Sequence, residues 1–204
     1  MNAFFESAAK EKVKGAIQAI ESETAAEIVV TVRDRSAVYR DADFIVGFVF
    51  ALLVLAGLTY APMEFNAMFF PAQVLVVFLV FAVGSAHIWF LKGLVVPAAR
   101  RRAEVARAAE SHFYQAQISR TTGRTGILVF VSAFERAVHF VPDLGVPVKK
   151  LGPAIDAART DLETALGKGD VDAFVARLKA LGPVLGKELP RSADDVNELP
   201  DEVS

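Results

Sequence analysis

The sequence predicts an α/β fold: a small mixed β-sheet with flanking helices, interrupted by a two-helix transmembrane hairpin. Short β-branched runs occur at residues 27–32, 126–132 and 137–141, and segments with helical spacing of apolar residues lie before, between and after them. Two long uncharged runs, residues 44–63 and 65–91, separate the first β-branched run from the second. Each is long enough to cross a bilayer core of about 30 Å, which takes roughly 20 helical residues.

Basic side chains flank both ends of the predicted hairpin. They are Arg33, Arg35 and Arg40 before it, and Lys92, Arg100, Arg101, Arg102 and Arg107 after it. The connecting loop around residues 62–70 contains Glu64 and neither lysine nor arginine. Because basic residues near the ends of spans resist translocation, we expect the loop outside and both termini in the cytoplasm.

The two spans divide the chain into four parts. We expect the first part of an aqueous domain at 1–43, the transmembrane hairpin at 44–96 with spans at about 44–63 and 69–91, the remainder of the aqueous domain at 97–187, and an acidic, mostly disordered tail at 188–204. An even number of spans returns the chain to its starting side. The two parts of the aqueous domain can therefore form one folded unit.

Composition excludes several classes of protein and of site. A mean hydropathy of +0.39 with 23% charged residues combines a lipid-facing part and an aqueous part. A net charge of −2 argues against binding to nucleic acid, which requires a basic surface. The sequence contains no cysteine, which excludes disulfides, thiolate metal sites and a cysteine nucleophile.

The first half of the aqueous domain is predicted to be a helix followed by a strand. Apolar residues recur at helical spacing through residues 4–20, which is typical of a helix packed on a sheet. Residues 27–32, EIVVTV, are typical of a buried strand. Residues 33–43 are polar and are expected to form a loop that leads into the first span.

After the second span, the sequence predicts a helix, two strands and two more helices. A helix begins near Ala98, and residues 126–132, GILVFVS, form a strand that is covered on both faces. The turn 132–136 connects it to an antiparallel strand at 137–141, whereas the crossover through a helix makes strands 27–32 and 126–132 parallel. The two last helices are expected around residues 155–166 and from Asp170, a good N-cap, toward Pro183.

The order of these segments resembles the TPM-domain family, in particular its bacterial membrane-hairpin branch. The family is named for thylakoid-lumen, photosystem-repair and receptor-auxiliary proteins. The matching residues are TAAEIVVTV before the hairpin, FYQAQISRTTGRTGILVFVSAFERAVHFVPDLGV after it, and DDVNELPDEV in the tail. The resemblance implies an α/β/α sandwich and a multi-pass location in the bacterial cytoplasmic (inner) membrane.

The resemblance also implies two kinds of function. Some members of the family are described as acid phosphatases or bind calcium through acidic residues at one sheet edge, and others are non-catalytic partners of membrane complexes. The positions that correspond by motif are Glu135 and Arg136 in SAFER and Asp143 in DLG.

The candidate site residues are few. Glu135 and Asp143 are the acidic pair that we expect to contact a calcium or magnesium ion, although hard cations want six to eight oxygens. Arg120, Arg124 and Arg136 are candidates for binding an anion. No other cofactor is expected. His87 lies within the second span, where an ionisable side chain indicates either an interfacial anchor or a proton pathway.

These observations favour a membrane-anchored interaction module that is not an enzyme, with the bilayer and an unidentified membrane protein complex as its partners. One alternative is a metal-dependent phosphatase, with Asp143 and Glu135 on the metal and Arg136 or Arg124 on the phosphate. The other is a small membrane transport subunit that uses the spans, with His87 in the pathway.

Overall fold

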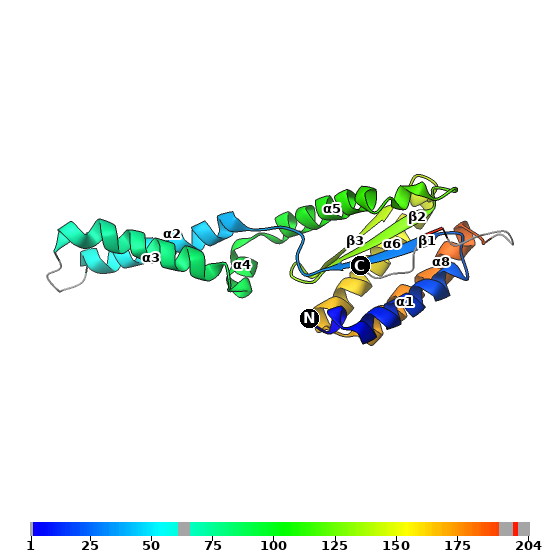
Figure 1. Cartoon of the computed structure of the whole chain (residues 1–204), viewed down its shortest axis with the longest axis horizontal. Coiled ribbons are helices and arrows are strands. Elements are labelled where there is room, and N and C mark those ends of the chain that lie inside the picture. The colour runs from blue at the N-terminus through cyan, green and yellow to red at the C-terminus, as the bar shows by residue number, and fades with distance from the viewer. Residues whose placement is uncertain (1, 61–65, 192–197, 200–204) are drawn as a thin grey trace. The chain divides into compact units, whose positions relative to one another are not determined.

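The computed structural model of the protein describes residues 2–60, 66–191 and 198–199. The chain divides into two compact units. One contains the residues up to Ala37 and from Arg102 onward, and the other is Val38–Arg101. The first is a mixed α/β unit and the second is helical (Figure 1). The α/β fold class predicted from the sequence is therefore confirmed.

Three strands form one mixed sheet within the described residues. They are β1 (Glu27–Arg33), β2 (Gly126–Ser132) and β3 (Ala137–Pro142), in the order β1-β2-β3. β1 pairs in parallel with β2, from Glu27 opposite Gly126, and β2 pairs antiparallel with β3. The predicted strand boundaries agree with these within one residue, because each strand is a short β-branched run bounded by polar or turn residues.

Helices bury both faces of this sheet. On one face, alternate residues such as Val30 and Val129 pack against α1 (Ser7–Glu21), α6 (Val148–Lys168), α7 (Val171–Lys179) and α8 (Leu181–Glu188). On the other face, Val29, Leu128 and Phe130 pack against α5 (Ala98–Gln115). Figure 1 shows α5 on one side of the sheet and α1 and α8 on the other. A strand that is buried on both faces has no polar alternation, which explains the continuous apolar run of β2.

The C-terminal helices correct the predicted boundaries. α6 ends at Lys168, and its C-cap Gly169 has φ 69°. The Asp170 side chain caps α7 by accepting a hydrogen bond from the Ala173 N–H at 2.9 Å. The single helix expected from Asp170 toward Pro183 is instead two helices that meet at Ala180. Pro183 explains the break, since a proline fits the first turn of a helix but clashes with the preceding turn further inside one.

The helical unit contains α2 (Arg40–Tyr60), a 3-10 turn (Ala67–Phe69), α3 (Phe70–Ser85) and α4 (Trp89–Val95). α2 begins inside the segment that was expected to be loop, and α3 ends before the predicted end of the second span at residue 91. Among the described residues, one helix, Arg40–Tyr60, is long and apolar enough to cross a membrane. α3 has 16 residues, or about 24 Å of helix, which is less than a bilayer core. Residues 61–63, the predicted end of the first span, lie outside the described residues.

α2 and α3 pack closely along their lengths (Figure 1). A Cβ atom added to Gly47 of α2 would lie 2.7 Å from the Phe78 carbonyl oxygen of α3, so a larger residue does not fit there. The Phe50 and Phe81 rings stack with their centroids 3.9 Å apart. The outward faces of both helices are apolar and exposed, with Phe44, Phe48, Leu53, Val76, Val80 and Val83 among the exposed side chains.

Candidate functional site

The two predicted metal ligands lie at opposite ends of β2. Glu135 is in the turn that follows Ser132, the last residue of the strand. Asp143 lies beside the first residue, because its N–H donates to the Gly126 carbonyl at 2.9 Å. Seven residues of strand span about 20 Å. Glu135 and Asp143 therefore cannot hold one cation together, and the predicted pairing is corrected by the antiparallel geometry of the β2–β3 hairpin.

Glu135 holds the segment that leads out of β1. Its buried carboxylate accepts the Ser36 N–H at 3.2 Å and a short hydrogen bond from the Ser132 hydroxyl. The Ser36 hydroxyl in turn donates to the Ser132 oxygen at 2.9 Å. Ser132 is thus a structural residue of the turn, as the sequence indicated, and its hydroxyl is directed at a carboxylate.

Of the three candidate arginines, Arg136 lies at this end of the sheet. It is exposed and adopts φ 50°, and its N–H donates to the Ala133 carbonyl at 3.3 Å to close the turn. Arg120 and Arg124 lie at the other end, in the loop that precedes β2. The structure therefore does not bring the three arginines together in one anion site.

Arg124 and Asp143 neutralise each other. The Arg124 Nε atom lies 2.9 Å from Asp143 Oδ2, and Arg124 Nη2 donates a hydrogen bond to Asp143 Oδ1 at 3.0 Å. The Leu144 N–H donates to the same Oδ1 at 2.8 Å, and Asp143 is buried. The pair therefore combines one charge-assisted hydrogen bond, to Oδ1, with a close ion contact at Oδ2, which accepts no hydrogen bond from the described residues. The pair fixes the loop before β2 to the chain that follows β3.

Gly145 completes this junction. Its N–H donates to the Arg124 carbonyl at 2.8 Å, and a Cβ atom at this position would lie 2.2 Å from the Gly123 carbonyl oxygen. A side chain there would separate the two segments. The DLG motif and the TTGRT loop are therefore one packed structure at the N-terminal end of β1 and β2.

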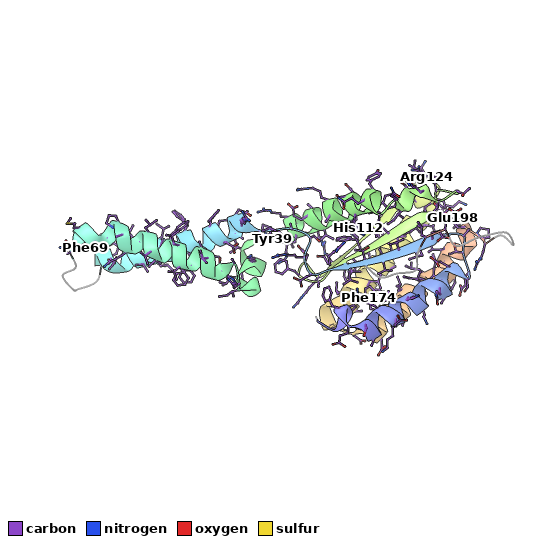
Figure 2. The ribbon with its side chains drawn as sticks, viewed as in Figure 1. Tyr39, Phe69, His112, Arg124, Phe174 and Glu198 are labelled. Carbon is purple, nitrogen blue, oxygen red and sulfur yellow. The ribbon has the colours of Figure 1, made fainter. Side chains whose placement is uncertain are left out.

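A carboxylate is bound in the same loop, although not by an arginine. The Glu198 side chain accepts the Thr122 N–H at 2.6 Å and the Thr122 hydroxyl at 2.5 Å. The hydroxyl and the N–H lower the pKa of Glu198 below its ordinary value. Figure 2 shows Arg124 and Glu198 at the same end of the α/β unit.

The backbone of the same segment is held by a buried acid. Glu27, the first residue of β1, accepts the N–H groups of Glu198 and Leu199, both at 3.3 Å. The Leu199 side chain is partly buried and packs against the core on the α5 face.

For residues 198–199, and for residues 188–191, the prediction of a mostly disordered tail at 188–204 is wrong. Glu188 is the last residue of α8, the Leu189 carbonyl accepts a hydrogen bond from the Thr24 hydroxyl at 2.8 Å, and Pro190 forms a β-bridge with Thr24. The remaining tail residues 192–197 and 200–204 lie outside the described residues.

The α/β unit contains two histidines, His112 in α5 and His139 in β3. The His112 Nε2 atom of α5 lies 3.0 Å from the Thr31 hydroxyl oxygen (His112 is labelled in Figure 2). Burial, together with the charge of Arg33, lowers the pKa of His112. Burial also lowers the pKa of His139, against the opposing effect of Glu110. Both side chains are therefore neutral at pH 7, in keeping with a packing role.

His87 bonds within its own segment. Its Nδ1 atom lies 3.2 Å from the Val83 carbonyl oxygen, and the residue is exposed at the end of α3.

The helical unit contains a buried polar cluster that the sequence reasoning missed. Asp43 is 7% exposed, Ser85 2% and Lys92 3%. The Ser85 hydroxyl donates to Asp43 Oδ1 at 2.9 Å, and Lys92 Nζ lies 3.3 Å from Asp43 Oδ2. In the sequence Asp43 and Lys92 stand immediately outside the two apolar runs. Their opposite charges at matching ends of a predicted hairpin were the available signal.

No family model matches the chain, and no curated protein matches it. Among solved structures, the chain is similar to the NMR structure of the BA42 protein from the psychrophilic bacterium Bizionia argentinensis. The two share 16% sequence identity with a TM-score of 0.58, over 98% of this chain and 93% of the other. At this identity the similarity shows a shared fold.

Proposed function

We propose that the protein is a membrane-anchored interaction module of the TPM-like type. Its α/β/α sandwich lies in the cytoplasm and is fixed to the bacterial inner membrane by a transmembrane hairpin made of α2 and α3. The module is not an enzyme and serves the assembly or regulation of a membrane protein complex.

The helical unit supports the membrane part of this proposal. α2 has 21 residues, or about 31 Å of helix, and beyond its charged first turn most of its exposed side chains are apolar. α3 is shorter, but it is preceded by a 3-10 turn and followed by α4, in which the uncharged run continues to Leu91, next to Lys92. The close approach of α2 to α3 at Gly47 is typical of helix packing in lipid, where small residues let backbones meet.

One observation carries the non-catalytic part: the buried carboxylates at both ends of the sheet already bind protein atoms. Asp143 binds Arg124, Glu135 binds the Ser36 and Ser132 donors, and Glu27 binds the tail backbone. A metal-dependent phosphatase needs several oxygens on its cation and a charge clamp on the phosphoryl group. Here Asp143, the candidate metal ligand, and Arg124, the candidate phosphate ligand, form an ion pair with each other.

Phosphomonoester hydrolysis tests the choice between module and phosphatase. The full-length protein in detergent, with calcium or magnesium, should hydrolyse a generic phosphomonoester no faster than its Asp143→Asn and Glu135→Gln variants. The two variants are assayed separately because their positions are about 20 Å apart. Asp156→Asn, which changes an exposed acid paired with Arg159, is the matched control. Turnover that is lost in Asp143→Asn or Glu135→Gln but kept in Asp156→Asn, at unchanged melting temperature, would establish the phosphatase instead.

A further inference from the structure

The N-terminal end of the sheet presents three contacts for one dipeptide, Glu198-Leu199. Thr122 supplies an N–H and a hydroxyl to a carboxylate, Glu27 accepts two successive backbone N–H groups, and the core on the α5 face takes a partly buried leucine. These contacts bind a charge, a backbone and an apolar side chain. Together they fit a Glu-Leu sequence.

The contacts are held in place by the fold itself. Glu27 is fixed by its pairing with Gly126 in the parallel sheet. The loop containing Thr122 is closed by the Thr125 N–H bond to the Thr121 hydroxyl at 3.1 Å and by the Arg124 N–H bond to the Thr121 carbonyl at 3.0 Å. The Arg124–Asp143 ion pair attaches this loop to the chain after β3. The binding groups are therefore preorganised, which reduces the entropy lost when a peptide binds.

The present occupant is held at the surface. Glu198 is exposed, and its carboxylate bonds to a single loop residue. A ligand attached to the same chain benefits from an effective concentration in the millimolar range, so a weak contact suffices to keep it bound. A free peptide of the same kind, present at high local concentration on a membrane complex, can compete with it.

We propose that this end of the sheet is a docking site for a partner protein's segment with a Glu-Leu sequence, and that residues 198–199 occupy it as an intramolecular competitor. The proposal rests on the proposed function as an interaction module and names the surface that such a module uses. The exposed Arg120, in the same loop, adds positive charge that favours an acidic segment.

The test uses full-length protein in detergent and a fluorescent peptide with the sequence of residues 193–203. Wild-type protein should bind this peptide weakly, because its own tail competes. The Glu198→Ala, Leu199→Ala variant, whose tail is released, should bind it at least tenfold more tightly. Adding Thr122→Val to that variant should weaken binding about tenfold, the loss expected for one hydrogen bond to a charged group.

Matched controls separate recognition from folding. Thr125→Val makes the same hydroxyl-to-methyl change three residues further along the loop and should leave peptide affinity unchanged. If Thr122→Val alters the melting temperature of the protein, the same contact is tested by changing the peptide. A peptide with glutamine in place of the glutamate that corresponds to Glu198 should also bind about tenfold more weakly. No binding by the tail-released variant, or equal effects of Thr122→Val and Thr125→Val, would overturn the proposal.

Two other outcomes are distinguishable. The wild-type protein could be a dimer that dissociates when Glu198→Ala and Leu199→Ala are introduced. That result would mean that the site binds the tail of a second copy, and it would overturn the proposal that a partner protein's peptide binds there. If the protein hydrolyses a phosphomonoester, the proposed function is wrong, whatever the result of the peptide-binding assay. If it neither hydrolyses the phosphomonoester nor binds the peptide, the docking site is wrong but the proposed membrane-anchored module is not contradicted.

Discussion

Lys92 and Asp43 form an ion pair inside the helical unit, with 3.3 Å between Lys92 Nζ and Asp43 Oδ2. Both side chains are almost fully buried, and the Ser85 hydroxyl donates to the same carboxylate. The pair joins the start of α2 to α4. Because each charge has a partner, the pairing offsets part of the free-energy cost of burying two charged side chains among apolar residues.

Removing one charge of this pair should strongly destabilise the helical unit. Lys92→Met leaves Asp43 buried without its cation, and we expect a loss of about 3–5 kcal/mol, the usual cost of breaking a buried pair. Arg100→Met, which removes the partially exposed partner of Asp41, should cost about 1 kcal/mol or less. The measurement is denaturant unfolding of the full-length protein in detergent, followed by circular dichroism.

The double variant makes that prediction specific. Asp43→Asn combined with Lys92→Met removes both charges and should recover part of the lost stability. Equal losses in Lys92→Met and Arg100→Met, or no recovery in the double variant, would show that the buried pair does not stabilise the hairpin.

The α/β unit should lose stability as the pH falls from about 7.5 to 5.5. His112 and His139 have pKa values below the ordinary 6.5 because they are buried in the folded state. The unfolded chain therefore binds more protons than the folded chain once the pH falls below about 6.5, and stability falls with it. The melting temperature measured against pH should show this slope, and His112→Gln and His139→Gln should each reduce it. A slope that is unchanged in both variants would contradict the assignment.

The α/β unit should fold without the hairpin. Its two core clusters draw on residues from both sides of the insertion, including Val30 from β1 and Val129 from β2. Replacing residues 44–96 by a short Gly/Ser linker should therefore give a soluble protein with one cooperative thermal transition, because the cost of loop closure grows slowly with length. Val30→Asp in the same protein should abolish the transition. A soluble product without cooperative melting would mean that the sheet needs the helical unit to form.

The strands and their pairing could be predicted from the sequence, whereas most contacts at the candidate site could not. EIVVTV and GILVFVS are recognisable because buried strands need β-branched residues, and a crossover of this kind makes them parallel. The same reasoning could have separated Glu135 from Asp143, since the two residues flank the antiparallel strand β3. The motif resemblance placed both acids in one site before that geometry was considered.

Other contacts join residues that are distant in the sequence. Glu135 binds Ser36, and Glu27 binds the backbone of residues 198–199. No local pattern encodes such pairs, because each depends on where the tertiary fold places two separate segments. The acidic composition of the tail likewise predicted disorder, but it does not show that a preorganised loop will bind one of its carboxylates.

Cysteine labelling in intact cells tests most directly whether the hairpin crosses the membrane with the α/β unit in the cytoplasm. The chain has no native cysteine, and the two reporter positions are highly exposed: Met68 at 82% in the loop region between α2 and α3, and Leu144 at 86% in the α/β unit. With a membrane-impermeant maleimide, Met68→Cys should react in intact cells, whereas Leu144→Cys should react after lysis alone. Labelling of Leu144→Cys from outside, or recovery of both variants in the soluble fraction, would contradict the account.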